Sequence, residues 1–477
     1  MPAPVSNDTV RSGLDPKWWV LAVTASGSFM SALDASVVNV ALPIIGRTTH
    51  APVSTVEWVI LVYLIASSAA LLLFGRLADI HGKRAIYMWG QGVFVAGSLC
   101  CGLSHGIGWL IASRALQAVG AAMIFALSPA ILIAAFPGTE RGRALGMQAT
   151  VTYLGLAIGP GLGGFLTQHW GWPTVFFINI PIGLAMLGLA YKVLQADRQA
   201  TGQPFDPAGA ATMAIALAGL LLFLSQGGKF GWGHPGMIAL AVIAVASGAA
   251  FILIERRSSH PALDFGLFRN RRFFASMLAA YLCYLSSAAV SFLLPFYLLA
   301  AAGRSPTQAG LAMMAVPLAM MSVTGLSGFL SDRIGVRLPA TAGMGLVAVG
   351  LFLLGALRPG FHPVHTVGAL ATVGFGVGLF TAPNNSAILG SVPSRHQGVA
   401  GALLAAARTV GFATGVAIAG LVYATALGGA PETARPAEIA QAVRLGMRII
   451  ALFALAGAVC SVLRGTHPRP LAAAGPG

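Results

Sequence analysis

Asp34 is the residue of this sequence that is best placed to do chemistry. It lies in the stretch SALDASVVNVALP, residues 31–43, within a long apolar run. Burial disfavours the charged form of a carboxyl group, and a charge in the middle of a bilayer costs about 3 kcal/mol on insertion scales. Such a group can take up and release a proton, and a cationic molecule can compete with the proton for it. The alternative is that Asp34 faces a water-filled vestibule and only shapes its helix.

Two arginines also stand within apolar segments. Arg114 occurs in RALQAVGAA, residues 114–122, and Arg408 in LLAAARTVG, residues 403–411. We interpret Arg114 as an unpaired cation that needs an acidic partner, backbone carbonyls or water. Arg408 is expected near the start of its helix, where its side chain can extend to the membrane surface.

Aromatic and amide side chains gather in two later segments. Tyr281 and Tyr284 stand three residues apart, and Asn384 and Asn385 are adjacent. Tyrosines can stack on flat molecules or hold cations, although aromatic residues on a helix more often serve packing. Glu57, in STVEW, is expected to be a solvated acid at a helix start, where the helix dipole favours it.

The composition requires these residues to be carried by membrane-spanning helices. The chain has 477 residues, of which 57% are hydrophobic and 9% charged, whereas soluble domains carry about 25% charged residues. An all-α polytopic membrane protein is therefore expected. The net charge of +15 comes without a basic helix or an aromatic-rich basic patch, so nucleic acid is not an expected partner. The four cysteines have neither metal-site nor CxxC spacing, and no metal is expected.

Apolar runs predict fourteen transmembrane helices. If both termini are cytoplasmic, 19 of the 28 Lys and Arg residues fall on the inside and seven on the outside, as the positive-inside rule requires. The polar N-terminal stretch lacks the apolar core of a cleaved signal peptide. The predicted helices cover residues 18–43, 56–74, 85–104, 109–135, 144–168, 173–193, 208–226, 236–255, 273–300, 308–330, 338–357, 364–391, 398–424 and 445–463.

The chain contains an internal repeat. GRLADIHGKR (75–84) and GFLSDRIGVR (328–337) share G-x-L-x-D-x-x-G-x-R, and LGLAIGPGLGG (154–164) matches VGFATGVAIAG (410–420) at nearly the same offset. These pairs predict two six-helix halves with two inserted helices, and such halves frame a midplane site in secondary transporters. The predicted parts are a cytoplasmic tail (1–17), a first bundle (18–193), a linker with two extra helices (194–272), a second bundle (273–463) and a second tail (464–477).

Two of the repeated motifs have a physical role that their residue types indicate. Glycines spaced by four residues allow helices to approach at backbone distance, and Pro160 can bend its helix, so we expect a hinge that consists of Gly155, Gly159, Pro160, Gly163 and Gly164. The other motif places charges and glycines in a tight cytoplasmic loop, where they can latch one half to the other. The expected latch, or conformational gate, consists of Gly75, Asp79, Gly82 and Arg84, with Asp332 and Arg337 as its copy.

Together these motifs give the chain a family resemblance over residues 18–463. It resembles the major facilitator superfamily, in particular its fourteen-helix drug:proton antiporter branch, with LDASVVNVALP as the first-helix motif and LGLAIGPGLGG as the antiporter motif of the fifth helix. Ser36 and Ala118 depart from the usual Thr and Gly. The resemblance implies proton coupling by Asp34 and Arg114. It implies a substrate site that includes Asp34, Tyr281, Tyr284, Asn384 and Asn385.

The expected function is proton-driven export of small amphiphilic compounds, with the proton gradient as energy source and no cofactor. The expected partners are the substrate, protons and membrane lipid, the expected state is a monomer, and the expected place is a bacterial inner membrane. A dedicated metabolite exporter of the same fold is the first alternative, and a non-transporting membrane sensor is another. An enzyme is not expected, because neither HExxH nor a Gly-flanked serine nucleophile occurs, and GxxxxGK[ST], the motif of nucleotide-driven transport, is also absent.

Overall fold

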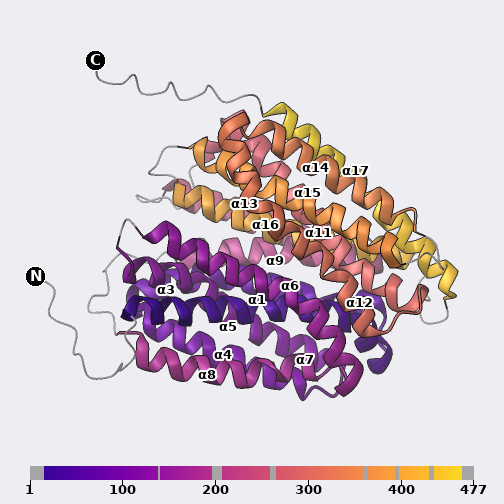
Figure 1. The fold of residues 1–477 in the computed structure, drawn as a ribbon, viewed down its shortest axis with the longest axis horizontal. Coiled ribbons are helices and arrows are strands. Elements are labelled where there is room, and N and C mark those ends of the chain that lie inside the picture. Colours follow the sequence, from indigo (N-terminus) through magenta and orange to yellow (C-terminus); the bar gives the residue numbers. More distant parts are fainter. Residues whose placement is uncertain are drawn as a thin grey trace, which may run out of the picture.

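The computed structural model describes residues 15–137, 140–195, 207–231, 233–257, 265–357, 363–392, 397–428 and 434–464. Every regular element within these ranges is a helix. Figure 1 shows two groups of long, roughly parallel helices, the earlier part of the chain in indigo and magenta and the later part in orange and yellow.

The first half is organised around α1, which runs over Pro16–Thr49. Pro16 stands in the first turn, where a missing N–H costs nothing, and the Asp15 side chain caps the helix at the Lys17 amide. Helix α1 packs against α5, α6 and α8 and is therefore mostly buried. The other helices of this half are α2 (Val53–Val56), α3 (Trp58–His81), α4 (Lys83–Gly102), α5 (Ile107–Ala135), α6 (Arg141–Trp170), α7 (Thr174–Phe177) and α8 (Asn179–Val193).

The second half repeats this plan around α11, which covers Arg271–Phe296 and packs against α15, α16 and α17. A short 3-10 helix, η1 (Phe265–Arg269), precedes it, and a π-helical turn, η2 (Tyr297–Ala301), extends it. The remaining helices are α12 (Pro306–Met313), α13 (Ala315–Ile334), α14 (Arg337–Leu354), α15 (Pro363–Gly390), α16 (Gln397–Ala426) and α17 (Pro436–Leu463).

The repeat in the sequence has a counterpart in the backbone. Gly82 ends α3 with φ +90°, Gly335 ends α13 with φ +85°, and each amide bonds to the carbonyl four residues earlier. Only glycine adopts this backbone conformation without strain. The expectation that GRLADIHGKR forms a loop is wrong, because residues 75–81 belong to α3 and only Gly82 separates α3 from α4.

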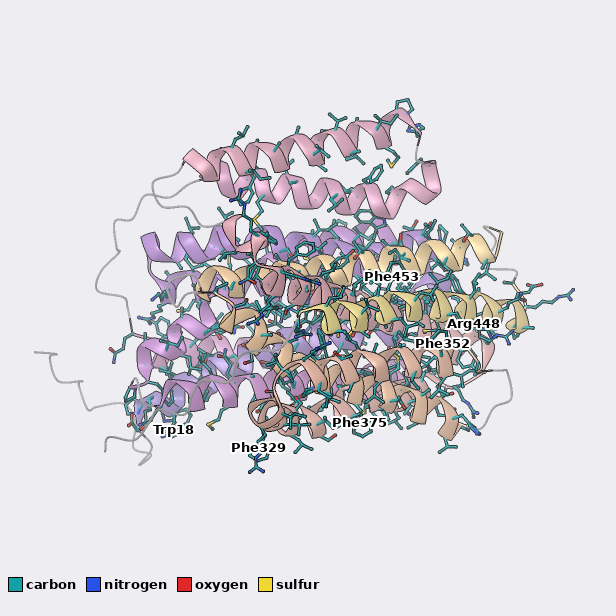
Figure 2. All side chains as sticks on the ribbon, turned by 90° about the horizontal axis from the view of Figure 1, so that it is seen from above. Trp18, Phe329, Phe352, Phe375, Arg448 and Phe453 are labelled. Atoms are coloured by element: carbon teal, nitrogen blue, oxygen red, sulfur yellow. The ribbon has the colours of Figure 1, made fainter. Side chains whose placement is uncertain are left out.

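Helices α9 (Pro207–Phe230) and α10 (Pro235–Arg257) form the inserted pair. Helix α9 contacts α3 of the first half and α16 of the second, and α10 packs mainly against α9. Figure 2 shows the two helices together along one edge of the bundle. The insert therefore covers the seam between the halves rather than joining either bundle.

Twelve helices of the described residues are long and apolar enough to cross a membrane. Each of the fourteen predicted segments overlaps a helix, but the predicted count of fourteen spans is not supported. Two other apolar stretches are shorter than a span: Val53–Ser68, over α2 and the first part of α3, and Ala211–Leu220, within α9. Helix α17 also begins nine residues before the predicted start, at Pro436, so Arg444 lies within the helix rather than before it.

The outside of the bundle carries large apolar side chains, as a lipid-facing surface should. Phe329, Phe352 and Phe375 are each 42% exposed or more, and Figure 2 labels Phe329 and Phe375 near one edge of the bundle.

Candidate functional site

Asp34 lies at the centre of a buried polar network in the first half. Its Oδ2 accepts a hydrogen bond from Nη1 of Arg114 at 2.6 Å, and its Oδ1 accepts from the side-chain amides of Gln117 and Asn179, both at 2.8 Å. The side chain is 0% exposed. A buried carboxylate is best tolerated when a cation is paired with it and further hydrogen-bond donors satisfy its remaining lone pairs.

Arg114 is equally well held. Its Nε donates to the carbonyl of Val59 at 3.2 Å and its Nη1 also donates to Oε1 of Gln117. The guanidinium carbon stands 4.2 Å from the ring centroid of Tyr63, a cation–π distance. The interpretation of Arg114 as unpaired is therefore wrong: its partner is Asp34, eighty residues earlier in the sequence.

Sequence reasoning did not assign Asn179 and Ser98 to this network. Asn179 begins α8, and Ser98 Oγ accepts from Nε2 of Gln117 at 2.7 Å. The available signal was a single amide in the apolar run FFINIPIG, residues 176–183. An amide in that position requires a polar partner.

The glycines of α6 let this helix touch α1 directly beside Asp34. A methyl group added at Gly155, Gly159 or Gly163 would overlap Phe29, Ser36 or Val37, respectively. Ser36 Oγ also donates to the carbonyl of Gly155 at 3.4 Å. Backbone-distance packing of the kind predicted from the spacing therefore fixes α6 against the helix that carries Asp34.

The opposite face of α6 meets the second half. A methyl group at Gly164 would overlap the carbonyl of Pro306, and one at Gly310 would overlap the carbonyl of Pro160. Thr307 N donates to Oε1 of Gln168 at 3.2 Å. These contacts lie at the C-terminal end of α6 and the start of α12, and they join the halves at the end of the bundle opposite the start of α1 and the end of α17.

A second contact of this kind joins α16 to the first half. Gly420, the repeat partner of Gly164, lies against the carboxylate of Glu57 so closely that a methyl group would overlap it. Glu57 is 2% exposed. The expectation of a solvated acid at this helix start is wrong, because α16 of the other half covers it.

The predicted substrate residues lie in the second half. Tyr284 stacks on Phe412 of α16 with ring centroids 5.8 Å apart, and the carbonyl of Tyr281 lies against Gly411. Asn384 is fully buried and donates to the carbonyl of Ser276 at 3.1 Å, whereas Asn385 is half-buried. No hydrogen bond among the described residues joins this group to Asp34.

Arg408 is the twelfth residue of α16, and its side chain is exposed. The candidate span of this helix begins at Leu403, so extension of the Arg408 side chain to the membrane surface stays a prediction. Arg408 and Tyr153 both lie close enough to Tyr284 to interact with it electrostatically, so a cation accompanies this tyrosine.

The predicted gate residues are only partly described. Arg84 donates to the carbonyl of Tyr191 at 2.9 Å and lies over the Tyr191 ring, both within the first half. Arg337 is exposed at the start of α14. The side chains of Asp79 and Asp332, and the surroundings of Gly75, lie outside the described set. The cysteines of the described chain are free, and no group of His, Cys, Asp or Glu within it could hold a metal.

Comparison with known proteins identifies the family to which this architecture belongs. The sequence profile of the Major Facilitator Superfamily matches residues 24–286 and again residues 273–476. The chain belongs to the major facilitator superfamily. This membership makes it a transporter with two homologous halves rather than an enzyme.

Similar proteins include transporters of different cargo. The riboflavin transporter RibZ of Clostridioides difficile is 35% identical over 414 residues, which cover 86% of this chain and 89% of the relative. The multidrug resistance protein Stp of Mycobacterium tuberculosis is 32% identical, with 85% and 75% covered. A bacterial homologue of the human lysosomal transporter Spinster has the same fold, with a TM-score of 0.69, 15% identity and 95% and 98% of the chains covered.

Proposed function

We propose that this transporter is a proton-coupled exporter of small amphiphilic compounds and belongs to the fourteen-helix branch of its superfamily. The observation that carries the proposal is the double role of α6. One face of α6 holds the helix of Asp34 through Gly155 and Gly159, and the other face holds the second half through Gly164.

The Asp34–Arg114 pair is the proton switch of this proposal. Protonation of Asp34 removes the charge that compensates Arg114 at 2.6 Å, and a buried cation without its partner is costly. The network then rearranges, α1 moves against the glycine face of α6, and the seal between α6 and α12 loosens. Two packings of the same helices thus differ by one proton, which is what alternating access requires.

The substrate is proposed to lie against Tyr281, Tyr284 and Asn385, on the second half. The tyrosine rings can stack on a flat apolar body. Arg408 adds a positive charge beside Tyr284, which favours neutral or anionic amphiphiles over dications. The latch of Asp79, Arg84, Asp332 and Arg337 is proposed to close the end of the bundle near the termini in the opposite state.

Two further helices complete the proposed topology. Helices α3 and α9 have 24 residues each, about 36 Å of helix, which exceeds the bilayer core of about 30 Å. With both counted as spans the termini share one side, which the charge distribution indicates to be the cytoplasm. A reporter enzyme that is active only outside the cytoplasm, fused at Gly233, should be active, and one fused at residue 200 should be inactive.

Transport is tested with purified protein in liposomes that are acidic inside and contain a pH-sensitive dye. A panel of cationic, neutral and anionic amphiphiles is added to wild type and to Asp34→Asn. Antiport predicts that a transported compound releases protons in wild type and not in the variant. Movement of a compound without proton flux would identify a facilitator and remove Asp34 from the mechanism.

A dedicated metabolite exporter is the second candidate, and the similarity to a riboflavin transporter over most of both chains favours it. Riboflavin is flat and amphiphilic, which suits the tyrosines of the proposed site. The panel is therefore extended with riboflavin: proton release by riboflavin alone would establish this candidate, and release by several unrelated compounds would establish multidrug export.

A further inference from the structure

A pocket lies within the second half, at the end of the bundle where α17 ends. It has a volume of about 170 Å³, far above the roughly 10–15 Å³ that admits one water molecule. Parts of α11, α15 and α17 and the residue before α14 enclose it. Its lining consists of Asn270, Arg272, Ser276, Val336, Ala387, Gly390, Ser391 and Arg464.

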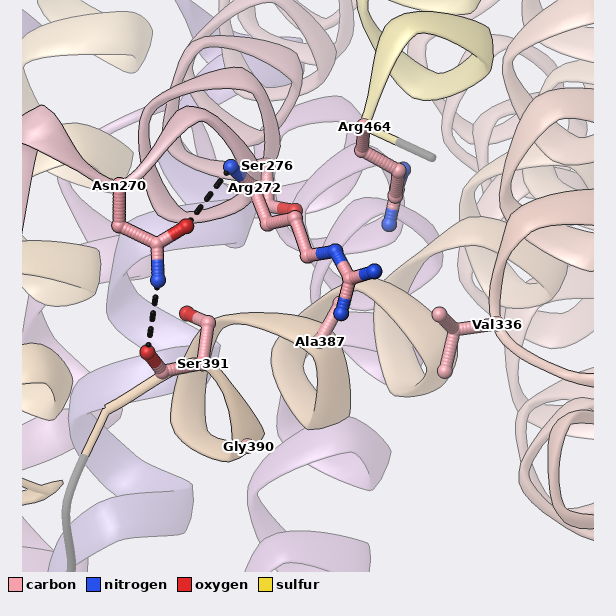
Figure 3. Close-up of a pocket in the computed structure, with 8 residues that line it drawn as sticks. All are labelled: Asn270, Arg272, Ser276, Val336, Ala387, Gly390, Ser391 and Arg464. Carbon is pink, nitrogen blue, oxygen red and sulfur yellow. Dashed lines mark hydrogen bonds between the residues drawn. The ribbon is translucent and has the colours of Figure 1, made fainter. Parts of the chain in front are cut away.

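Two guanidinium groups face this pocket and no described acid does. Figure 3 shows Arg272 at the start of α11 and Arg464 at the end of α17 reaching into the same space. Arg464 is 3% exposed. Burial lowers the pKa of its guanidinium to about 10. Because this pKa is still well above 7, the group is a cation at neutral pH.

Arg464 keeps an unused donor. Its Nε and Nη2 donate to the carbonyl and the hydroxyl of Ser461, whereas Nη1 is buried and has no hydrogen-bond partner among the described residues. The Oγ of Ser276, which is 0% exposed, is also without a partner there. A buried N–H group of a guanidinium and a buried hydroxyl that lack partners are costly, and an anion in the pocket would satisfy both Nη1 of Arg464 and Oγ of Ser276.

Asn270 organises the pocket but has little left to offer a ligand. Its Oδ1 accepts from the amide of Arg272 and caps α11, and its Nδ2 donates to the carbonyl of Ser391 at 3.0 Å. These bonds hold the start of α11 against the end of α15, so the two arginines face a preformed space.

The depth of the pocket indicates the kind of anion. The apolar span of α11 begins at Arg271 and that of α17 ends at Leu463, so both arginines stand where the hydrocarbon core gives way to lipid headgroups. We propose that this pocket binds a phosphate group, carried by an anionic lipid or present as free phosphate. Guanidinium groups bind the oxygens of phosphate with paired hydrogen bonds, and the site lies within one half, apart from Asp34 and from the seal between the halves.

The test uses the full-length protein purified in detergent. Short-chain phosphatidylglycerol, the matching diacylglycerol without phosphate, and inorganic phosphate are titrated separately, and binding is read from the melting temperature and from native mass spectrometry. We expect Arg272→Gln and Arg464→Gln each to weaken phosphatidylglycerol binding about tenfold or more, since each removes charge-assisted hydrogen bonds. Arg271→Gln is the matched control, because it removes the same charge one residue away and outside the pocket lining.

The ligand series separates the two sources of phosphate. Binding of inorganic phosphate with the same dependence on Arg272 and Arg464 means that the free ion suffices, whereas binding of phosphatidylglycerol alone assigns a lipid. Ser276→Ala, a small change that should fold, is expected to weaken binding about threefold and provides a measurement if Arg464→Gln is not obtained.

Three results would overturn the proposal. One is equal weakening by Arg271→Gln and Arg272→Gln, which would indicate general surface charge. Another is binding of the diacylglycerol as tight as that of phosphatidylglycerol. The third concerns Asp332, the acid nearest to Val336 in the sequence, whose side chain is not described: phosphate binding that appears only in Asp332→Asn would mean that the chain fills the pocket with its own carboxylate.

Discussion

At the scale of single residues, the Asp34–Arg114 pair should reveal its coupling in a double-variant cycle. Asp34→Asn and Arg114→Gln each leave one buried charge without its partner, which costs about 3–5 kcal/mol. The double variant leaves neither charge and should be closer to wild type in stability than either single variant. The measurement is the melting temperature of each purified protein.

Transport activity distinguishes this role from simple packing. All three variants should lose proton-coupled transport, including the double variant whose stability is largely restored. Additive destabilisation in the double variant would show that the two charges do not interact, contrary to their 2.6 Å contact.

The residue scale also shows where sequence reasoning ends. The positions of Asp34 and Arg114 within apolar segments identified them as candidate functional residues, because a charge in the bilayer core is costly. Their pairing was not predictable, since it depends on which faces of α1 and α5 meet. Glu57 was misjudged for the same reason: its own helix start is polar, but α16 of the other half covers it.

At the scale of helices, the glycine face of α6 makes a specific prediction. Gly159→Ala adds a methyl group that overlaps Ser36 on α1, and overpacking of this kind costs about 1–3 kcal/mol. We expect reduced stability and at least a tenfold loss of transport, because α1 carries Asp34. Gly146→Ala, on the same helix with nothing within 4 Å of the added atom, is the control and should leave both properties unchanged or slightly improved. Equal effects of the two substitutions would contradict the proposed contact.

The two contacts between the halves should respond differently to the same substitution. A methyl group at Gly164 meets the backbone of Pro306, which cannot move alone, whereas one at Gly420 meets the end of the Glu57 side chain. Gly164→Ala should therefore impair transport more severely than Gly420→Ala.

Adding Glu57→Asp, which shortens the side chain and keeps the carboxyl group, should restore transport in Gly420→Ala. Failure of this rescue would mean that the carboxylate of Glu57, rather than the space beside Gly420, limits the contact.

At the scale of the whole molecule, apolar runs and repeats predicted much of the architecture. A run of about twenty apolar residues has few alternatives to a spanning helix, and each of the fourteen predicted segments overlaps a helix. The repeated glycines also predicted two similar halves, and Gly82 and Gly335 share one backbone conformation. The repeat could not indicate which contacts cross between the halves. Similarity between two six-helix units describes how each unit folds and not where one unit touches the other.

The arrangement of the halves leads to a final prediction. Thr307 and Gln168 join α12 to α6 at the end of the bundle opposite the start of α1, and rocking of one half against the other must separate them. In a cysteine-free background, Gln168→Cys together with Thr307→Cys should react with a short thiol cross-linker in the absence of substrate. The cross-link should abolish transport and a reducible linker should allow recovery.

The control pair replaces Gly355 and Arg448, which are hydrogen-bonded within the second half. Its cross-link should leave transport intact because the two residues move as one body. Transport that survives the cross-link between the halves would mean that this end of the bundle stays closed throughout the cycle, and alternating access would then require a movement within a single half.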